Sequence, residues 1–447
     1  MIKQITKFFS ALPPQEGKID AGIIKQQYNR LRWSVFISST LGYSLFYVCR
    51  LSLSVVKKPM VDAGILNESE LGMIGSALFF TYAIGKLTNG FFADRSNIRR
   101  FMATGLLLTA LINLALGFAI PFMLFALLWG LNGWFQSMGA APSVVALARW
   151  FSNKERGTYY GLWSASHSLG KAITFVVVAF FVSVAGWQWG FWGAGLIGLV
   201  GALVVAIFLH DSPESCGLPS IADYKNDHAV VSSTGKSVGA LQKEVVKNPF
   251  IWILALSSAL MYISRYSIES WGIYYLQAQK GYTNLEASSI ISVSAVSGIV
   301  GTVISGFISD RFFHGSRNVP ALIAGILNVV SLLLFLFFPD GNIWADTLSM
   351  VVSGFALGIL ITFLGGLMAV DIASKKASGA ALGLIGIASY IGAGIQDLVS
   401  GFLIGANHTS LNGVENYDFS TVKIFWLGAA LLSVVAALLV WNAKAED

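Results

Sequence analysis

Twelve apolar segments, each about as long as a helix that crosses a lipid bilayer, constrain this chain more than any other feature. A helix needs about 20 residues to span the hydrocarbon core, and only short polar connections separate most of the segments. Only 12% of the 447 residues are charged and 55% are hydrophobic, whereas soluble domains carry about 25% charged residues. The sequence therefore predicts an all-α integral membrane protein with spans at 33–56, 71–93, 101–119, 122–147, 158–182, 187–209, 249–277, 287–309, 319–338, 343–371, 378–404 and 420–441.

The net charge of +6 does not indicate a nucleic-acid-binding protein, because the basic residues are scattered at the ends of apolar segments. The two cysteines, Cys49 and Cys216, predict no disulfide or metal site. Residues 1–32 are polar and basic and lack the short apolar core of a signal peptide. No nucleotide-binding or catalytic-triad pattern is found, so we expect no enzyme activity and no cofactor.

The distribution of Lys and Arg predicts the orientation of the chain. With both termini inside, the inside segments hold six of these residues in 1–32, six in 95–156, four in 210–248 and five in the second half, or 21 of the 29. The outside loops hold four: Lys57, Lys58, Lys280 and Lys423. Such an excess places both termini in the cytoplasm of an inner membrane. The expected domains are a cytoplasmic segment 1–32, a six-helix half 33–209, a linker 210–248, a second half 249–441 and a tail 442–447.

The two halves repeat each other in sequence. Gly-Phe-Phe-Ala-Asp-Arg at 90–95 recurs as Gly-Phe-Ile-Ser-Asp-Arg at 306–311, and Gly85 recurs as Gly301 at the same offset. This order predicts two pseudo-symmetric six-helix units in parallel orientation, with a solute site between them near mid-membrane. Asp94-Arg95 and Asp310-Arg311 fall at inside helix ends. There they either order the loops or form ion pairs that change with the gating state.

Arg50 and Arg265 are charged residues inside predicted spans, where a charge is costly and needs a reason. Each lies about 17 residues into its span, Arg50 in the first and Arg265 in the seventh. Either one alone is compatible with a side chain that snorkels to the membrane surface. The matched depth at equivalent repeat positions favours a pair that faces a shared cavity. The planar fork of Arg suits phosphate or carboxylate.

Other polar residues fall near these arginines. Tyr43 and Tyr47 precede Arg50 on one helix face, and Tyr262 precedes Arg265. Each of these tyrosines is either a ligand of the solute or an anchor at the membrane interface. Lys86 lies late in the second span. His167 and Lys171 share a face of the fifth span. His167 either has a structural role or, by its protonation, matches the charge state of a phosphate monoester.

Two acidic residues accompany this positive set: Glu269, one turn after Arg265, and Asp397 in the eleventh span, toward the outer side and without an assigned partner. The first and fourth spans contain no carboxylate of the kind that proton-coupled transporters use. Excess buried cation with little buried anion predicts an anionic solute.

The repeated Gly-x3-Asp-Arg loop resembles the major facilitator superfamily, over the whole chain. A narrower resemblance, to the organophosphate:phosphate antiporters with their glycerol-3-phosphate and hexose-6-phosphate transporters and a related sensor, rests on several motifs. They are Leu-Gly-Tyr-Ser-Leu-Phe-Tyr-Val-Cys-Arg (41–50), Gly-Lys (85–86), Asp-Arg-Ser-Asn (94–97), Phe-Gln-Ser-Met-Gly (135–139), Lys-Glu-Arg-Gly (154–157), His-Ser-Leu-Gly (167–170), Asp-Ser-Pro-Glu-Ser-x-Gly-Leu-Pro (211–219) and Arg265 followed by Trp271.

This resemblance implies exchange of a phosphate monoester for inorganic phosphate. The family's essential arginines fall on Arg50 and Arg265, its lysine on Lys86, its histidine on His167, and its first-span tyrosines on Tyr43 and Tyr47. Departures from the family pattern concern the organic part of the substrate: Leu51 and Ala295 replace a lysine and a glutamate, Leu382 and Ile385 replace an aspartate and a lysine, and Lys171 replaces a glycine. The amino-acid sequence around 41–50 and 211–224 is most similar to the hexose-phosphate sensor and transporter branch of the family.

We therefore expect a rocker-switch antiporter of a sugar phosphate or glycerol-3-phosphate against inorganic phosphate, in contact with membrane lipid and no nucleic acid. Two alternatives remain. One is a membrane sensor of sugar phosphate that signals to a partner. The other is a proton-coupled transporter of a neutral solute.

Overall fold

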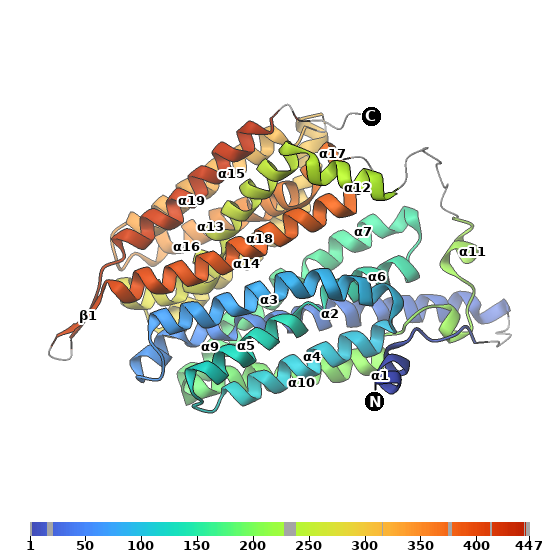
Figure 1. The fold of residues 1–447 in the computed structure, drawn as a ribbon, viewed down its shortest axis with the longest axis horizontal. Helices are drawn as coiled ribbons and strands as arrows, with labels where there is room; N and C mark the ends of the chain where they lie inside the picture. Colours follow the sequence, from blue (N-terminus) through green and yellow to red (C-terminus); the bar gives the residue numbers. More distant parts are fainter. Residues whose placement is uncertain are drawn as a thin grey trace.

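A computed structural model describes residues 2–15, 21–227, 238–314, 316–373, 378–411, 414–441 and 443. Almost every element in these residues is a helix that runs along one common direction (Figure 1). The first half contains α1 (Ile2–Phe9), α2 (Ala21–Asp62), α3 (Glu68–Arg95), α4 (Ile98–Leu116), α5 (Phe122–Gln136), α6 (Ala140–Trp150), α7 (Asn153–Ser164), α8 (Ser166–Ile173), the π-helical η1 (Thr174–Val178), α9 (Ala179–Ala185) and α10 (Trp187–Phe208).

The second half repeats this plan after a segment that contains η2 (Glu214–Cys216), α11 (Ile221–Lys225) and α12 (Val238–Lys247). It contains α13 (Pro249–Lys280), α14 (Asn284–Phe312), α15 (Asn318–Phe337), α16 (Ile343–Thr362), the π-helical η3 (Phe363–Leu367), α17 (Met368–Ile372), α18 (Ser378–Ala406) and α19 (Ser420–Leu439). A short antiparallel hairpin, β1 (His408–Leu411) and β2 (Val414–Tyr417), lies between α18 and α19.

Eleven helices in the described residues are long and apolar enough to cross a membrane. The remaining predicted span, the fourth at 122–147, is divided into α5 and α6 by a short break at 137–139. Neither piece reaches the length of a spanning helix, although the two together do. Each of the other predicted spans coincides with a helix or with successive helices that at most one residue separates. The first is longer than predicted, because α2 begins at Ala21 and ends at Asp62.

The internal repeat extends to the helix starts. Asn67 caps the first turn of α3 in a capping box with Glu70, and Thr283 caps α14 in the same way with Glu286. Both pairs are 216 residues apart, the offset that separates Gly85 from Gly301. Such boxes satisfy backbone N–H groups at a helix start, so equivalent helices begin at equivalent residues.

The repeated glycines have a packing reason. A Cβ atom at Gly85 would lie 2.5 Å from the Ser137 hydroxyl, and one at Gly301 would lie 2.2 Å from the Phe355 carbonyl. In each half the second helix therefore approaches the fourth more closely than any side chain permits, as is common where spanning helices pack.

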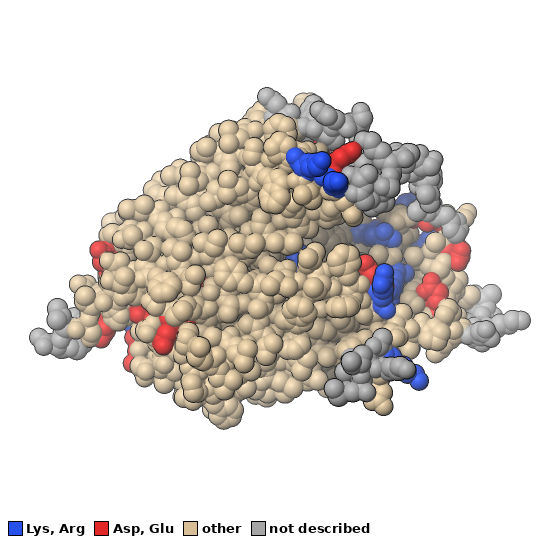
Figure 2. Space-filling model, in the orientation of Figure 1, with Lys and Arg blue, Asp and Glu red and all other residues tan. Residues whose placement is uncertain are grey.

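The two halves lie side by side, with α2 to α10 below and α13 to α19 above in Figure 1. We call the end that carries β1 and β2 the hairpin end, and the end that carries α1, α11 and α12 the termini end. On the face drawn in Figure 2, charged side chains gather at these two ends, and the surface between them is almost entirely uncharged. Residues 442 and 444–447 of the predicted tail, Lys375, Lys376, and residues 228–237 of the predicted linker lie outside the described residues.

Candidate functional site

A cavity of about 510 Å³ lies between the halves. It reaches from Arg265 in the interior to Gly90 and Asp94 at the last turns of α3, so it extends toward the termini end. Figure 2 shows a hollow between the upper and lower halves at that end, with Lys and Arg side chains inside it. Its lining includes most of the polar residues that the sequence predicts for the site: Tyr43, Tyr47, Lys86, His167, Tyr262 and Arg265.

Arg50 lies just behind this lining, within α2. Its side chain is 3% exposed, and its guanidinium carbon lies 4.7 Å from the centre of the Tyr47 ring and 4.1 Å from that of Tyr82. None of its three side-chain nitrogens has a hydrogen-bond partner among the described residues. Arg50 and Arg265 were expected to face one cavity together, but Arg50 lies beneath the Tyr47 and Tyr82 rings, which form the cavity wall.

Arg265 lies on α13 in the opposite half and is equally buried. Its Nε donates to Glu269 Oε1 at 2.9 Å, and its guanidinium lies 5.3 Å from the Tyr262 ring centre and 5.1 Å from that of Tyr266. Its Nη2 has no partner in the described part of the chain. Each half therefore brings one buried guanidinium with unused donors to the middle of the protein.

Lys171, a buried lysine, belongs to α8 in the first half. Its Nζ donates to the same Glu269 Oε1 at 2.8 Å, so one carboxylate oxygen holds cations from both halves. The other oxygen, Oε2, has no partner among the described residues. Residues 171 and 265 also line a smaller polar pocket beside the main cavity, together with Ser168, Ser294 and Ser353.

Lys86 and His167 face the main cavity from α3 and α8. The Lys86 ammonium lies 5.5 Å from the Tyr390 ring centre and has no carboxylate partner among the described residues. The His167 Nδ1 contacts the carbonyl oxygen of Ser164. Because a carbonyl can only accept, Nδ1 carries a hydrogen and Nε2 remains for a ligand.

Four tyrosines of the site were not predicted from the sequence: Tyr82, Tyr160 and Tyr390, which line the cavity, and Tyr266, which lies beside Arg265. Tyr82 and Tyr390 have ring centres 4.5 Å apart across the two halves, and Tyr262 lies 5.5 Å from Tyr390. These rings form a continuous path from Arg50 to Arg265. Tyr82 lies one turn before Lys86, a spacing that identifies it once Lys86 is suspected.

Asp397 does not belong to this cavity. It lies between the halves on the hairpin side, and its Oδ1 accepts from Lys57 Nζ at 2.8 Å and from the Ser270 hydroxyl at 2.7 Å. The prediction that Lys57 lies in an outside loop is therefore wrong. Because α2 continues past the predicted end of the first span, Lys57 is fully buried, with its ammonium 3.6 Å from the Trp271 ring centre.

The halves are closed against each other at the hairpin end. Besides Lys57 and Asp397, the Tyr274 hydroxyl donates to Glu68 at 2.6 Å, and the Asn284 amide donates to the Val55 carbonyl at 2.8 Å. Helices α3 and α18 touch through glycine, since a Cβ at Gly72 would lie 2.9 Å from the Gly401 Cα. The cavity is thus open to the termini end and sealed from the hairpin end.

The predicted gating residues Asp94, Arg95, Asp310 and Arg311 are exposed at the termini end. The Asp94 carbonyl accepts from Arg149, but no side-chain ion pair involves any of the four among the described residues. Arg149 instead pairs with Asp211 at 2.7 Å. Their gating role therefore stays a prediction.

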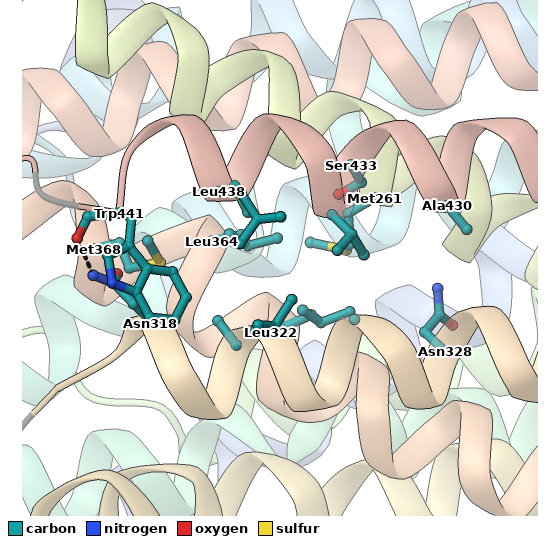
Figure 3. Close-up of a pocket in the computed structure, with 15 residues that line it drawn as sticks. Met261, Asn318, Leu322, Asn328, Leu364, Met368, Ala430, Ser433, Leu438 and Trp441 are labelled. Carbon is teal, nitrogen blue, oxygen red and sulfur yellow. Dashed lines mark hydrogen bonds between the residues drawn. The ribbon is translucent and has the colours of Figure 1, made fainter. Parts of the chain in front are cut away.

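A third pocket, shown in Figure 3, lies within the second half between α15 and α19. Met261, Leu322, Leu364 and Leu438 give it an apolar lining, and none of its lining residues is charged. It does not suit an anionic solute.

The fold, the paired halves and the buried cationic cavity define a class. The model of the Major Facilitator Superfamily matches residues 33–396, and the chain belongs to this superfamily. The fold agrees: a bacterial homologue of the human lysosomal transporter Spinster, in an inward-facing and unoccupied conformation, superposes with a TM-score of 0.70 at 18% identity, covering 92% of this chain and 97% of that one.

Curated relatives narrow the comparison. The chain is 32% identical to a probable hexose phosphate transport protein of Chlamydia pneumoniae, over 99% of this chain and 98% of that protein. It is 30% identical to the glycerol-3-phosphate transporter of Bacillus subtilis, over 96% of each. It is 32% identical to the membrane sensor protein UhpC of Salmonella typhimurium, over 83% of this chain and 85% of that protein. The predicted resemblance and the predicted fold class are confirmed.

Proposed function

We propose that this protein exchanges a phosphorylated organic solute, such as a hexose 6-phosphate or glycerol 3-phosphate, for inorganic phosphate. The observation that carries the proposal is the pair of buried guanidinium groups, one from each half, with unused donors beside a cavity that both halves line. Guanidinium forks bind phosphate oxygens in bidentate fashion and stay charged when buried. The names of the relatives point to the same chemistry.

Exchange follows from the cost of closing the cavity empty. Arg50 is already buried without a counter-ion within hydrogen-bond reach, and closure would also bury the exposed Lys86 ammonium, which has no carboxylate partner among the described residues. Sealing such cations away from water costs several kcal/mol unless an anion neutralises them. A phosphate or phosphate ester supplies that charge on both the inward and the outward journey, so the loaded carrier changes state and the empty one does not.

The proposed orientation places the termini end in the cytoplasm. On the face drawn in Figure 2, the termini end carries blue Lys and Arg side chains together with acidic ones, whereas red acidic side chains predominate at the hairpin end. This distribution agrees with the positive-inside rule. In that orientation the structure is open to the cytoplasm, with halves 33–209 and 249–441 as the moving bodies and 210–248 as the cytoplasmic connection.

Reconstituted vesicles test the proposal. Proteoliposomes loaded with labelled phosphate are expected to release it when glucose 6-phosphate or glycerol 3-phosphate is added outside, and not when glucose is added. Release driven equally by glucose, or release into plain buffer at the same rate, would refute the exchange mechanism.

A sensor is the second candidate, because one of the relatives is a membrane sensor protein. Its signature is ligand binding without exchange by folded protein in the same vesicles. In that case the arginines recognise the phosphate ester, and the cytoplasmic segments carry the signal to a partner.

A further inference from the structure

One buried carboxylate lies within the phosphate site and is not used by the proposed exchange. Glu269 Oε1 accepts from Arg265 Nε at 2.9 Å and from Lys171 Nζ at 2.8 Å, and all three side chains are nearly inaccessible. The three groups come from both halves, since Lys171 lies on α8 in the first half and the other two lie on α13 in the second. This arrangement places an anion where the substrate phosphate is expected.

The contact with Arg265 is half of the contact that the two groups are able to make. On a guanidinium the Nε and Nη2 hydrogens lie on one edge, which matches the two oxygens of a carboxylate or phosphate. Here Nε is used, while both Arg265 Nη2 and Glu269 Oε2 have no partner among the described residues. The carboxylate is held by one oxygen only, and that oxygen is shared with Lys171.

We propose that Glu269 is an internal counter-ion that occupies Arg265 in the empty carrier and that the incoming phosphate displaces it. Lys171 keeps hold of the displaced carboxylate, so its negative charge never becomes unpaired. The phosphate then fills the Nε–Nη2 edge of Arg265 with two oxygens. This inference rests on the proposed function and assigns Glu269 and Lys171 as residues that set the affinity for phosphate.

The arrangement keeps phosphate binding reversible. Three buried cations, Arg50, Arg265 and Lys171, would hold a phosphate too tightly for rapid exchange if no anion accompanied them. Each charge-assisted hydrogen bond is about twice as strong as a neutral one. A competing carboxylate lowers the affinity, since binding must first break the bond between Arg265 and Glu269. Lys171 acts in the opposite direction, because it prevents Glu269 from closing both oxygens onto Arg265.

The two partners of one ion pair are therefore expected to have opposite effects when they are replaced. Glu269→Gln removes the competitor and is expected to tighten binding of inorganic phosphate by about tenfold or more, the size of one charge-assisted hydrogen bond. Lys171→Met frees Glu269 to grip Arg265 with both oxygens and is expected to weaken binding by about tenfold. Loss of structure alone does not tighten binding, so the Gln result separates this role from a packing role.

The experiment is calorimetric titration of inorganic phosphate into the purified full-length protein in lipid nanodiscs. The variants are the two above, Glu269→Asp as the conservative replacement with near-normal affinity, and the double variant. In the double variant the Lys171 effect is expected to vanish, because Lys171 acts through Glu269. Thermal unfolding in the same nanodiscs checks that each variant is folded.

The outcomes separate the two proposals. If the unmodified protein binds neither phosphate nor a phosphate ester, the proposed function and this inference both fail. If it binds phosphate but the Gln variant binds no more tightly, only the inference fails. If Lys171→Met still weakens binding in the Gln background, Lys171 contacts the phosphate itself and the positioning role is wrong.

Discussion

Asp397→Asn is expected to open the hairpin end. The change keeps the shape of the side chain and an oxygen for the Ser270 hydroxyl, but it leaves the Lys57 ammonium buried without a countercharge. The two ion-paired side chains are 0% and 2% exposed and come from opposite halves. Removing one partner of such a pair costs about 3–5 kcal/mol, and only the closed state bears this cost because separation of the halves exposes Lys57 to water.

The lower value, about 3 kcal/mol, corresponds to a shift of roughly 150-fold in the equilibrium between the closed and open hairpin end. Spin labels at Ala119 and Asp340, two exposed loop positions in opposite halves, report this separation by pulsed electron resonance once Cys49 and Cys216 have been replaced. The unmodified protein is expected to give one short distance, and the variant a second, longer one.

Two controls sharpen the test. Lys58 and Asp62 form an ion pair on the neighbouring turn of α2, but Asp62 is 52% exposed and both residues lie in one half. Asp62→Asn is therefore expected to change the distances little, as exposed pairs contribute at most about 1 kcal/mol. Replacing Lys57 by Met and Asp397 by Leu together is expected to restore the short distance. An unchanged distance in folded Asp397→Asn would refute the assignment of this pair as a gate.

Three further predictions follow from single contacts. Arg50→Lys is expected to reduce phosphate exchange in proteoliposomes more than tenfold, because Lys keeps the charge but lacks the fork; near-normal exchange would contradict bidentate binding. Gly75→Ala is expected to mimic the open hairpin end in the distance measurement, because its Cβ would lie 1.7 Å from an Asp397 oxygen, whereas Gly90→Ala on the same helix has free space and serves as the control. Asp211→Asn is expected to lower the free energy of unfolding by about 2 kcal/mol, because this 2%-exposed carboxylate accepts hydrogen bonds from Arg149 and from two backbone N–H groups. An unchanged melting temperature would show that these bonds add no net stability.

The sequence was sufficient for the spans, the repeat and the class of protein, because each of these leaves a local or periodic pattern. Hydropathy alone located α13 and α10 to within a few residues, and the 216-residue offset related the halves. The equal depth of Arg50 and Arg265 was visible for the same reason. Their different relation to the cavity was not, since it depends on how the rings of Tyr47 and Tyr82 fold over Arg50.

The sealed hairpin end could not be predicted from one sequence. Lys57 and Asp397 are 340 residues apart, and the adjacent Lys58 makes position 57 read as part of a polar loop. Nothing local distinguishes a lysine that is buried against Trp271 from one that is solvated. The shared use of Glu269 by Arg265 and Lys171 is hidden likewise, because helical spacing predicts the first contact but not the second.

Helix α13 connects the phosphate site with the sealed end, and Ser270→Ala tests that connection. Glu269 lies in the phosphate site, and the next residue, Ser270, accepts from Lys57 at 2.8 Å and donates to Asp397 at 2.7 Å. The substitution removes two hydrogen bonds but leaves the ion pair, so it is expected to cost about 2 kcal/mol and shift the open population about thirtyfold. Phosphate is expected to enlarge this shift, because displacement of Glu269 moves the backbone that carries Ser270. A phosphate-independent shift would mean that α13 does not relay binding to the gate, and a shift as large as that of Asp397→Asn would mean that the two hydrogen bonds contribute as much as the ion pair.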